Sequence, residues 1–232
     1  MNERPLLPSA ALDAAGLNRQ HVFDIADLPA EVAATLGDTT DFRQLILIAH
    51  GGRRLWDCIQ AAGQAGEHPV DDYAVGVIRR WCADALPGRR TRLLYPGDAP
   101  VPLQRLGILA GWHHAAPFMV GVDITWGPWW AYRAALLADS DFCASRAVDR
   151  TSPCAGCAKR PCISACPAGA MDAGRFALET CLAFRRQAAS PCAFTCLARE
   201  ACPVGAEHRY DAAQLRHSYG QSLSMLHGRT SR

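Results

Sequence analysis

The sequence predicts an α+β protein built from two parts, and three observations lead to this prediction. Residues 1–150 alternate between helical and strand-like patterns of apolar residues. All six Trp lie in that region, whereas eight of the 11 Cys fall between Cys154 and Cys202. A turn-favouring Ser-Pro pair stands where the composition changes. We therefore expect a larger domain over residues 1–150 and a small one over residues 151–232.

The first elements of the larger domain are two short helices and two strands. Residues 9–16 begin with a capping Ser and end in Gly, and residues 29–37 begin with Pro and end in Gly, which predicts a helix in each. Residues 21–25 alternate between apolar and polar side chains, as in a half-buried strand. Residues 44–49 are short and rich in Ile and Leu, which predicts a buried strand.

The later elements of this domain are again mixed. A helix carrying Leu55 is expected after Gly51-Gly52, and residues 70–86 show the clearest helical spacing of apolar residues. Together with the strands, this pattern indicates an α+β sandwich. The remaining expected elements are strands over residues 92–95, 118–124 and 129–138 and a helix over residues 103–110.

Charge and hydropathy exclude several classes of protein. The net charge of +2 predicts no strong nucleic-acid patch. The longest clean apolar run, Leu45–Ala49, is far shorter than the roughly 20 residues of a membrane span. Because Met1–Pro5 leads into no long apolar stretch, we expect a cytoplasmic protein without a signal peptide. Clustered thiols in such a protein indicate metal or redox chemistry rather than disulfides.

The cysteines form two runs that each end in Cys-Pro, with Cys181 between them. This layout resembles that of two-cluster bacterial ferredoxins, in which the last Cys of one run serves the other cluster. Two [4Fe-4S] clusters need eight thiolates, which is the number in this block. The predicted ligands are Cys154, Cys157, Cys162 and Cys202 for one cluster and Cys166, Cys181, Cys192 and Cys196 for the other.

Zinc is the alternative for these eight thiols. Two four-thiolate zinc sites commonly present paired C-x2-C knuckles, and this block contains a single one. The other cysteines, Cys58, Cys82 and Cys143, each stand alone in an apolar pattern. We expect them to be small buried hydrophobic residues without a ligand role.

Several segments match a known family in order. Asp72-Tyr73 opens a helix, Asp98-Ala99-Pro100 precedes Gly111-Trp112, and the Gly127–Trp130 segment comes before the cysteines. This order resembles that of epoxyqueuosine reductases, which are cobalamin-dependent and carry a corrinoid domain followed by a two-cluster ferredoxin-like domain. Reductive dehalogenases share this plan. The resemblance implies a nitroreductase-like, corrinoid-binding α/β sandwich followed by a small ferredoxin-like domain.

The resemblance also implies functional residues in the first domain. Tyr73 and Asp98 would lie near the substrate, with Asp98 as a proton donor. Aromatic residues concentrated in one stretch would line a corrinoid, and flavin is the alternative cofactor because the fold is related to that of flavin nitroreductases. The implied cofactor-binding residues are Trp112, His113, Trp126, Trp129 and Trp130.

The chain departs from the family in four ways. Ala74 replaces the His of an Asp-Tyr-His element, and His113-His114-Ala115 replaces a Gly-Lys-Asn/His segment. The cysteine spacings are longer than those of the family. The chain ends 30 residues after Cys202, without the helical-repeat tail that holds tRNA in the family, so tRNA is not an expected partner.

The predicted function is electron transfer through two clusters to a corrinoid, in an oxidoreductase that resembles epoxyqueuosine reductase or processes cobalamin. The expected partners are an external donor of the flavodoxin or ferredoxin type and a small-molecule or corrinoid substrate, with no membrane. The alternative is a non-enzymatic, ferredoxin-type electron carrier whose first domain docks a partner protein.

Overall fold

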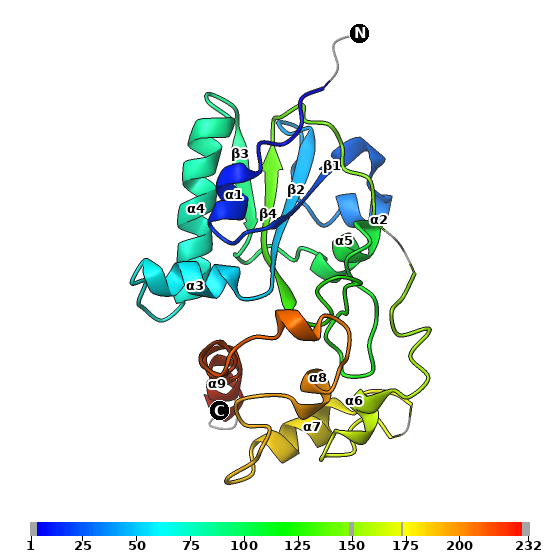
Figure 1. Ribbon diagram of the computed structural model, residues 1–232. Helices are drawn as coiled ribbons and strands as arrows, with labels where there is room; N and C mark the ends of the chain where they lie inside the picture. The colour runs from blue at the N-terminus through cyan, green and yellow to red at the C-terminus, as the bar shows by residue number, and fades with distance from the viewer. Residues whose placement is uncertain (1–3, 149–150, 173, 229–232) are drawn as a thin grey trace. The chain divides into compact units, whose positions relative to one another are not determined.

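A computed structural model (Figure 1) describes residues 4–148, 151–172 and 174–228. These residues divide into two compact units, one of residues 4–113 and 130–148 and the other of residues 114–129 and 151–228. The second unit therefore includes a segment that lies well before residue 150 in the chain. No helix in the described part of the chain combines the length and the apolar character that crossing a membrane requires.

The first unit is built on a four-stranded antiparallel sheet with the strand order β1-β2-β4-β3. All eight residues of β2 are buried, because strands pair along both of its edges and helices cover both faces of the sheet. The strands are β1 (Arg19–Asp24), β2 (Gln44–Gly51), β3 (Thr91–Tyr95) and β4 (Trp130–Ala138). These strands confirm four of the five expected from the sequence.

The helices of the first unit lie on both sides of this sheet. In Figure 1, α1, α3 and α4 lie on one side and α2 and α5 on the other. A buried core of Val77, Ile78 and Trp81 from α4 packs against Ile46 and Ile48 of β2, which explains the helical spacing seen in the sequence. The helices are α1 (Ala10–Ala14), α2 (Ala30–Ala33), α3 (Arg54–Ala61), α4 (Pro69–Ala85) and α5 (Leu103–Leu109), with a 3-10 turn over Ile25–Asp27.

Gly16 ends α1 for two physical reasons. Its φ of +83° lies in the left-handed region, which strains any residue that carries a Cβ. A Cβ at this position would also lie 2.4 Å from the Cα of Leu55, so the absence of a side chain lets the end of α1 approach α3. The helix stop predicted from the sequence is therefore also a packing position.

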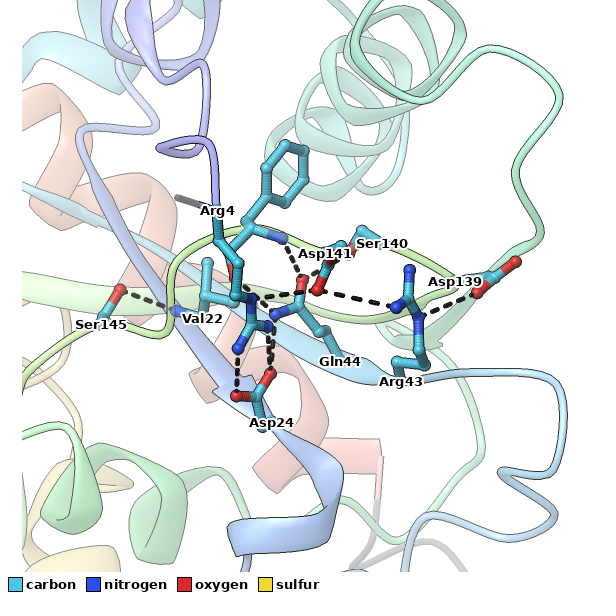
Figure 2. A network of polar contacts seen from close by, with 10 residues as sticks. Arg4, Val22, Asp24, Arg43, Gln44, Asp139, Ser140, Asp141 and Ser145 are labelled. Atoms are coloured by element: carbon cyan, nitrogen blue, oxygen red, sulfur yellow. Dashed lines mark hydrogen bonds and ion pairs between the residues drawn. The ribbon is translucent and has the colours of Figure 1, made fainter. Parts of the chain in front are cut away.

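A buried polar network joins β2 to the segment that follows β4 (Figure 2). The Gln44 side chain is fully buried, and its amide nitrogen donates to the Phe142 carbonyl oxygen and to Asp24 Oδ1, each at 2.8 Å. Its amide oxygen accepts from the Ser140 hydroxyl at 2.7 Å and from the Phe142 backbone N–H at 2.9 Å. Arg4 donates to both carboxylate oxygens of Asp24 and so ties the N-terminal segment to the same network.

The second unit consists of three short helices and one longer C-terminal helix, joined by loops. Its helices are α6 (Pro161–Ser164), α7 (Leu178–Arg185), α8 (Leu197–Glu200) and α9 (Ala212–Gly228), with a 3-10 turn over Ala206–His208. Phe118, Val122 and Met171 form its buried core together with Cys162 and Cys202. The cysteine block is therefore part of the core of this unit.

The strand expected over residues 118–124 is wrong. These residues form turns with isolated bridges, because Met119 has a φ of +69° and Asp123 Oδ1 accepts the backbone N–H groups of Thr125 and Trp126. Phe118 and Val122 pack among the cysteines. Their spacing in the sequence is the same as that of residues buried on one face of a strand, so local periodicity cannot distinguish the two cases.

Candidate functional site

Four of the predicted cluster ligands line one cavity of the second unit. The cavity has a volume of about 460 Å³. Cys154 and Cys157 lie in the loop before α6, Cys162 lies in α6, and Cys202 follows α8. The Cys157 backbone N–H donates to the Cys154 carbonyl oxygen at 3.3 Å and closes a turn. The side chains at both ends of this turn line the cavity.

The other four predicted ligands line a second cavity of about 420 Å³ in the same unit. Cys166 follows α6, Cys181 lies on α7, and Cys192 and Cys196 lie in the loop before α8. Each cavity is thus lined by one of the two sets of four cysteines that the sequence predicts to share a cluster. In each set, three of the cysteines belong to one stretch of chain and the fourth comes from a distant stretch.

The two cavities share an apolar wall. Phe118, Met119, Met171 and Phe176 line both of them. Phe118 and Met171 are almost fully buried, whereas Met119 is exposed. Apolar surroundings of this kind exclude water and lower the local dielectric constant around any group that occupies the cavities.

Burial controls the ionisation of these thiols. It raises the pKa of Cys154, and the neighbouring Cys202 and Cys162 raise it further. It likewise raises the pKa of Cys196, although the backbone N–H groups of Arg199 and Ala198 oppose this rise. Four thiolates in one such cavity would repel one another, so deprotonation needs a cationic group among them. This donor chemistry fits a metal-containing group held by thiolates.

Close contact between two backbone segments fixes the position of the chain after Cys202. A Cβ on Gly127 would lie 1.8 Å from the Val204 carbonyl oxygen, and a Cβ on Gly205 would lie 2.4 Å from the Trp126 carbonyl carbon. Both glycines have positive φ angles, of +57° and +63° respectively. The absence of both side chains allows the Trp126–Gly127 segment to cross directly beside Val204–Gly205, which follow the Cys202-Pro203 pair.

Three of the predicted corrinoid-binding residues lie together in the first unit. The rings of Trp112 and Trp130 meet edge to face with centroids 6.4 Å apart, and His113 lies 6.1 Å from Trp130. His113 Nδ1 and the Tyr132 hydroxyl are 3.2 Å apart. The Arg19 guanidinium lies 4.5 Å from the Trp112 ring centroid. Since Trp112 and Trp130 are buried against one another, this aromatic group is closely packed and does not form an open lining.

The other two predicted corrinoid-binding residues belong to the second unit. Trp126 packs against His208, with ring centroids 4.3 Å apart. Trp129 is fully buried and meets Tyr210 at 5.4 Å. The structure therefore divides the five residues into separate groups, each with its own neighbours.

Tyr73 and Asp98 have different environments. Tyr73 is half-buried on α4, packs against the core, and has its pKa raised by burial and by the neighbouring Cys58. Asp98 is exposed in the turn after β3, next to Gly97. The turn chemistry of Pro96-Gly97-Asp98 thus accounts for the placement of this carboxylate.

The three remaining cysteines lie in the first unit, and none of them lines either cavity. Cys58 and Cys82 are half-buried, and Cys82 packs against the core as expected. Cys143 is exposed, so the expectation of burial is wrong for this residue. The residue before it, Phe142, is the one whose side chain is buried in the core.

Two buried arginines of the second unit were not recognised in the sequence. Arg185 and Arg199 expose only 8% and 7% of their surfaces. A signal for each was present: Arg185 follows the apolar stretch Leu182–Phe184, and Arg199 lies between the predicted ligands Cys196 and Cys202. Long charged residues are almost never buried unless their charge is compensated, so both positions require a physical explanation.

His21, beside the aromatic group of the first unit, predicts a pH dependence of stability. Burial, with a smaller contribution from Arg19, lowers the pKa of His21 to about 4. Since His in an unfolded chain has a pKa near 6.5, the unfolded state takes up a proton first as the pH falls. The stabilisation is therefore complete above about pH 6.5 and is lost progressively towards about pH 4, a difference of about 2 kcal/mol between pH 7.5 and 5.

Urea unfolding at these two pH values measures this effect. His21→Leu should remove most of the difference, because Leu stays neutral throughout the range. An equal pH dependence in the wild type and His21→Leu would show that other groups cause it.

Comparisons with known proteins show that the fold is similar to that of two kinds of reductase. No protein-family model and no curated protein matches the sequence. The chain is similar to a structure of epoxyqueuosine reductase from Bacillus subtilis, at 14% identity and a TM-score of 0.54, over 89% of this chain and 67% of that one. It is also similar to an epoxyqueuosine reductase solved with an epoxyqueuosine-modified tRNA stem loop, at 13% identity and a TM-score of 0.56, over 90% and 67%.

A reductive dehalogenase, whose structure suggests a mechanism for B12-dependent dehalogenation, also matches. The identity is 12% and the TM-score 0.51, over 93% of this chain and 33% of that one. The resemblance to epoxyqueuosine reductases expected from the sequence is therefore confirmed at the level of the fold.

Proposed function

We propose that this protein is an iron-sulfur redox protein that holds one [4Fe-4S] cluster in each of the two cysteine-lined cavities. The observation that carries the proposal is the grouping of the eight cysteines. Cys202 reaches the cavity of the first run, and Cys166 reaches the cavity of the second. Exchange of the last ligand between two runs is typical of two-cluster ferredoxins. The small second unit would then be a ferredoxin-like domain.

The shape of the cavities supports a cluster over a single ion. A zinc ion needs its thiolates at about 2.3 Å from one point. No group of three or more His, Cys, Asp or Glu side chains is arranged to hold one metal ion in the part of the chain that the structure describes. Cysteines spread around cavities of about 460 and 420 Å³ suit a larger group. A bound [4Fe-4S] cluster supplies single-electron transfer.

The protein's own groups would prepare these sites for such a cofactor. Backbone N–H groups face the sulfur atoms, with that of Leu197 directed at Cys192 and that of Val204 at Cys202. Hydrogen bonds of this kind stabilise negative charge on sulfur. The apolar side chains of Phe118, Met171 and Phe176 line both cavities and would lower the local dielectric constant around a bound cluster.

The similar structures favour a reductase as the class of enzyme. Epoxyqueuosine reductases and a reductive dehalogenase share this fold, and the dehalogenase structure suggests B12-dependent chemistry. We therefore propose an oxidoreductase that receives electrons from a flavodoxin or ferredoxin-type donor and acts on a small molecule or a corrinoid. Tyr73 and Asp98 are the first-unit residues proposed to act near the substrate.

The aromatic residues of the first unit do not support a corrinoid lining in the arrangement observed. The rings of Trp112 and Trp130 pack against one another, and His113 is paired with the Tyr132 hydroxyl. We assign no step to a corrinoid on these residues. This packing favours a second candidate function, a ferredoxin-type electron carrier whose first unit binds a partner protein.

Metal analysis and cobalamin binding separate these possibilities. The chain is reconstituted anaerobically with iron and sulfide and should retain about eight of each per chain, with broad visible absorption. Retention of zinc with little iron would overturn the cluster proposal. Equilibrium dialysis against cobalamin then distinguishes the two functions: retention supports the corrinoid-linked reductase, and no retention by the cluster-loaded protein supports the carrier.

A further inference from the structure

Arg185 at the end of α7 is buried beside the second cavity, which it helps to line. Its Nε donates to the Cys192 carbonyl oxygen at 3.2 Å, and its Nη1 donates to the Ser222 hydroxyl at 2.9 Å. Its Nη2 donates to the carbonyl oxygens of Ala193 and Tyr219 at 3.3 and 3.2 Å. The guanidinium is thus held in one place by neutral acceptors.

Arg199 on α8 is buried close to the same set of cysteines. Its Nε and Nη2 donate to the Pro128 carbonyl oxygen at 3.1 and 2.6 Å. Its guanidinium lies 4.6 Å from the ring centroid of Trp129 and 4.9 Å from that of Tyr210. The backbone N–H of Arg199 also faces the Cys196 thiol.

Among the ion pairs of the described residues, no carboxylate joins Arg185 or Arg199. Arg199 also donates a hydrogen bond to the Tyr219 hydroxyl, whose pKa is raised by burial, so that this partner stays neutral. Arginine stays protonated in proteins, so burial cannot be relieved by loss of a proton. A buried charge without an opposite charge nearby destabilises the fold, even where neutral groups accept its hydrogen bonds. The fold therefore needs a negative group close to these two guanidinium groups.

With a bound cluster, the second cavity would carry thiolates, with Cys192 close enough to feel the charge of Arg185 and Cys196 that of Arg199; the Glu200 carboxylate also acts on Cys192. Burial raises the pKa of Cys192, and the charge of Arg185 opposes that rise. The first cavity differs, because the arginines that line it, Arg160 and Arg175, are exposed to solvent. Water screens an exposed charge and leaves a buried one strong, so the two cavities differ in the positive charge that acts on them.

We propose, on the basis of the two-cluster function above, that Arg185 and Arg199 are the internal counter-charges of the cluster in the second cavity. Their buried positive charge makes the reduction potential of this cluster higher than that of the cluster in the first cavity. Addition of one electron makes a cluster more negative, and a nearby fixed cation lowers the free energy of that reduced state. Electrons supplied by an external ferredoxin or flavodoxin would then rest on the second cluster.

Potentiometric titration followed by electron paramagnetic resonance tests this proposal on the reconstituted chain. Cys162→Ser and Cys192→Ser isolate the second and first clusters, and the isolated second cluster should have the higher midpoint. Arg185→Gln should lower the reduced-to-oxidised ratio of the second cluster at least tenfold at a fixed potential, which corresponds to 59 mV for one electron.

Two matched variants separate charge from structure. Arg186→Gln removes the same charge from the adjacent, exposed position of the helix end and should leave the second midpoint unchanged. Arg185→Lys keeps the charge with fewer hydrogen bonds and should retain most of the wild-type midpoint. Equal shifts in Arg185→Gln and Arg186→Gln, or in Arg185→Gln and Arg185→Lys, would overturn the proposal.

Iron and sulfide content distinguishes the two levels of proposal. If the wild-type chain binds no clusters, the proposed function fails. If the clusters are present and the second does not have the higher midpoint, or does not respond to Arg185→Gln and Arg199→Gln, the inference about the arginines fails while the cluster function stands. If Arg185→Gln loses its iron, the test is the order of the two midpoints in Cys162→Ser and Cys192→Ser. A second cluster whose midpoint is not the higher one would overturn the inference about the arginines.

Discussion

Replacing Cys162 by Ser is expected to halve the iron content of the reconstituted protein, from about eight to about four per chain. Cys162 is buried in the first cavity with Cys154, Cys157 and Cys202. A hydroxyl is a much weaker ligand for iron than a thiolate, and a cluster missing one ligand is readily lost. The second cavity has its own four cysteines and should keep its cluster. Iron and sulfide analysis with visible absorption measures the loss.

The controls use cysteines in other places. Cys192→Ser should likewise leave about four irons, and the double variant Cys162→Ser/Cys192→Ser should leave almost none. Cys143→Ser, on an exposed thiol outside both cavities, should keep the full content. If Cys162→Ser lost all of its iron while the second unit stayed folded, the proposal that the two cavities bind their clusters independently would be wrong.

Gln44→Leu is expected to be the most destabilising single change in the first unit, by roughly 3 kcal/mol or more. Leu fits the space but removes both the donor and the acceptor that Gln44 provides. The buried N–H and carbonyl groups of Phe142 and the hydroxyl of Ser140 would lose their partner (Figure 2). Each buried polar group left without a hydrogen bond costs about 1–3 kcal/mol. Urea unfolding monitored by Trp fluorescence gives the change in free energy.

Gln60→Leu serves as the matched control. Gln60 is exposed on α3, so the same chemical change should alter the unfolding free energy by less than about 0.5 kcal/mol. If Gln44→Leu were no more destabilising than Gln60→Leu, the network of Figure 2 would contribute little to stability. The cluster content of the second unit provides a separate readout, which Gln44→Leu is not expected to change directly.

Local patterns predicted most of the secondary structure. The fully buried β2 and the amphipathic α4 were recognised because the spacing of apolar residues directly reflects which faces are buried. Glycines at helix ends were recognised because a positive φ favours Gly, as at Gly16. The failure over residues 118–124 has the opposite cause: Phe118 and Val122 are buried by cysteine loops distant in sequence, and a turn organised by Asp123 replaces the strand.

The grouping of the eight cysteines around two cavities could be predicted from the sequence, whereas the surroundings of the cavities could not. The eight cysteines and their division into two sets follow from the two Cys-Pro endings. The role of Gln44 could not be read from the sequence, because its four hydrogen bonds join it to three residues of β1 and of the segment after β4. The separation of Trp126 and Trp129 from Trp130 was equally hidden, since the three lie within five residues of one another.

By itself, the sequence determined the α+β class, the positions of most elements and the number of thiolates that could be shared between two clusters. These features depend on local periodicity and on the chemistry of single residue types. Only the tertiary structure decided which charges are buried, placing Arg185 and Arg199 near one set of cysteines while Arg160 and Arg175 stay exposed at the other. Burial is a property of contacts between distant segments, and it is burial that gives a charge its strength.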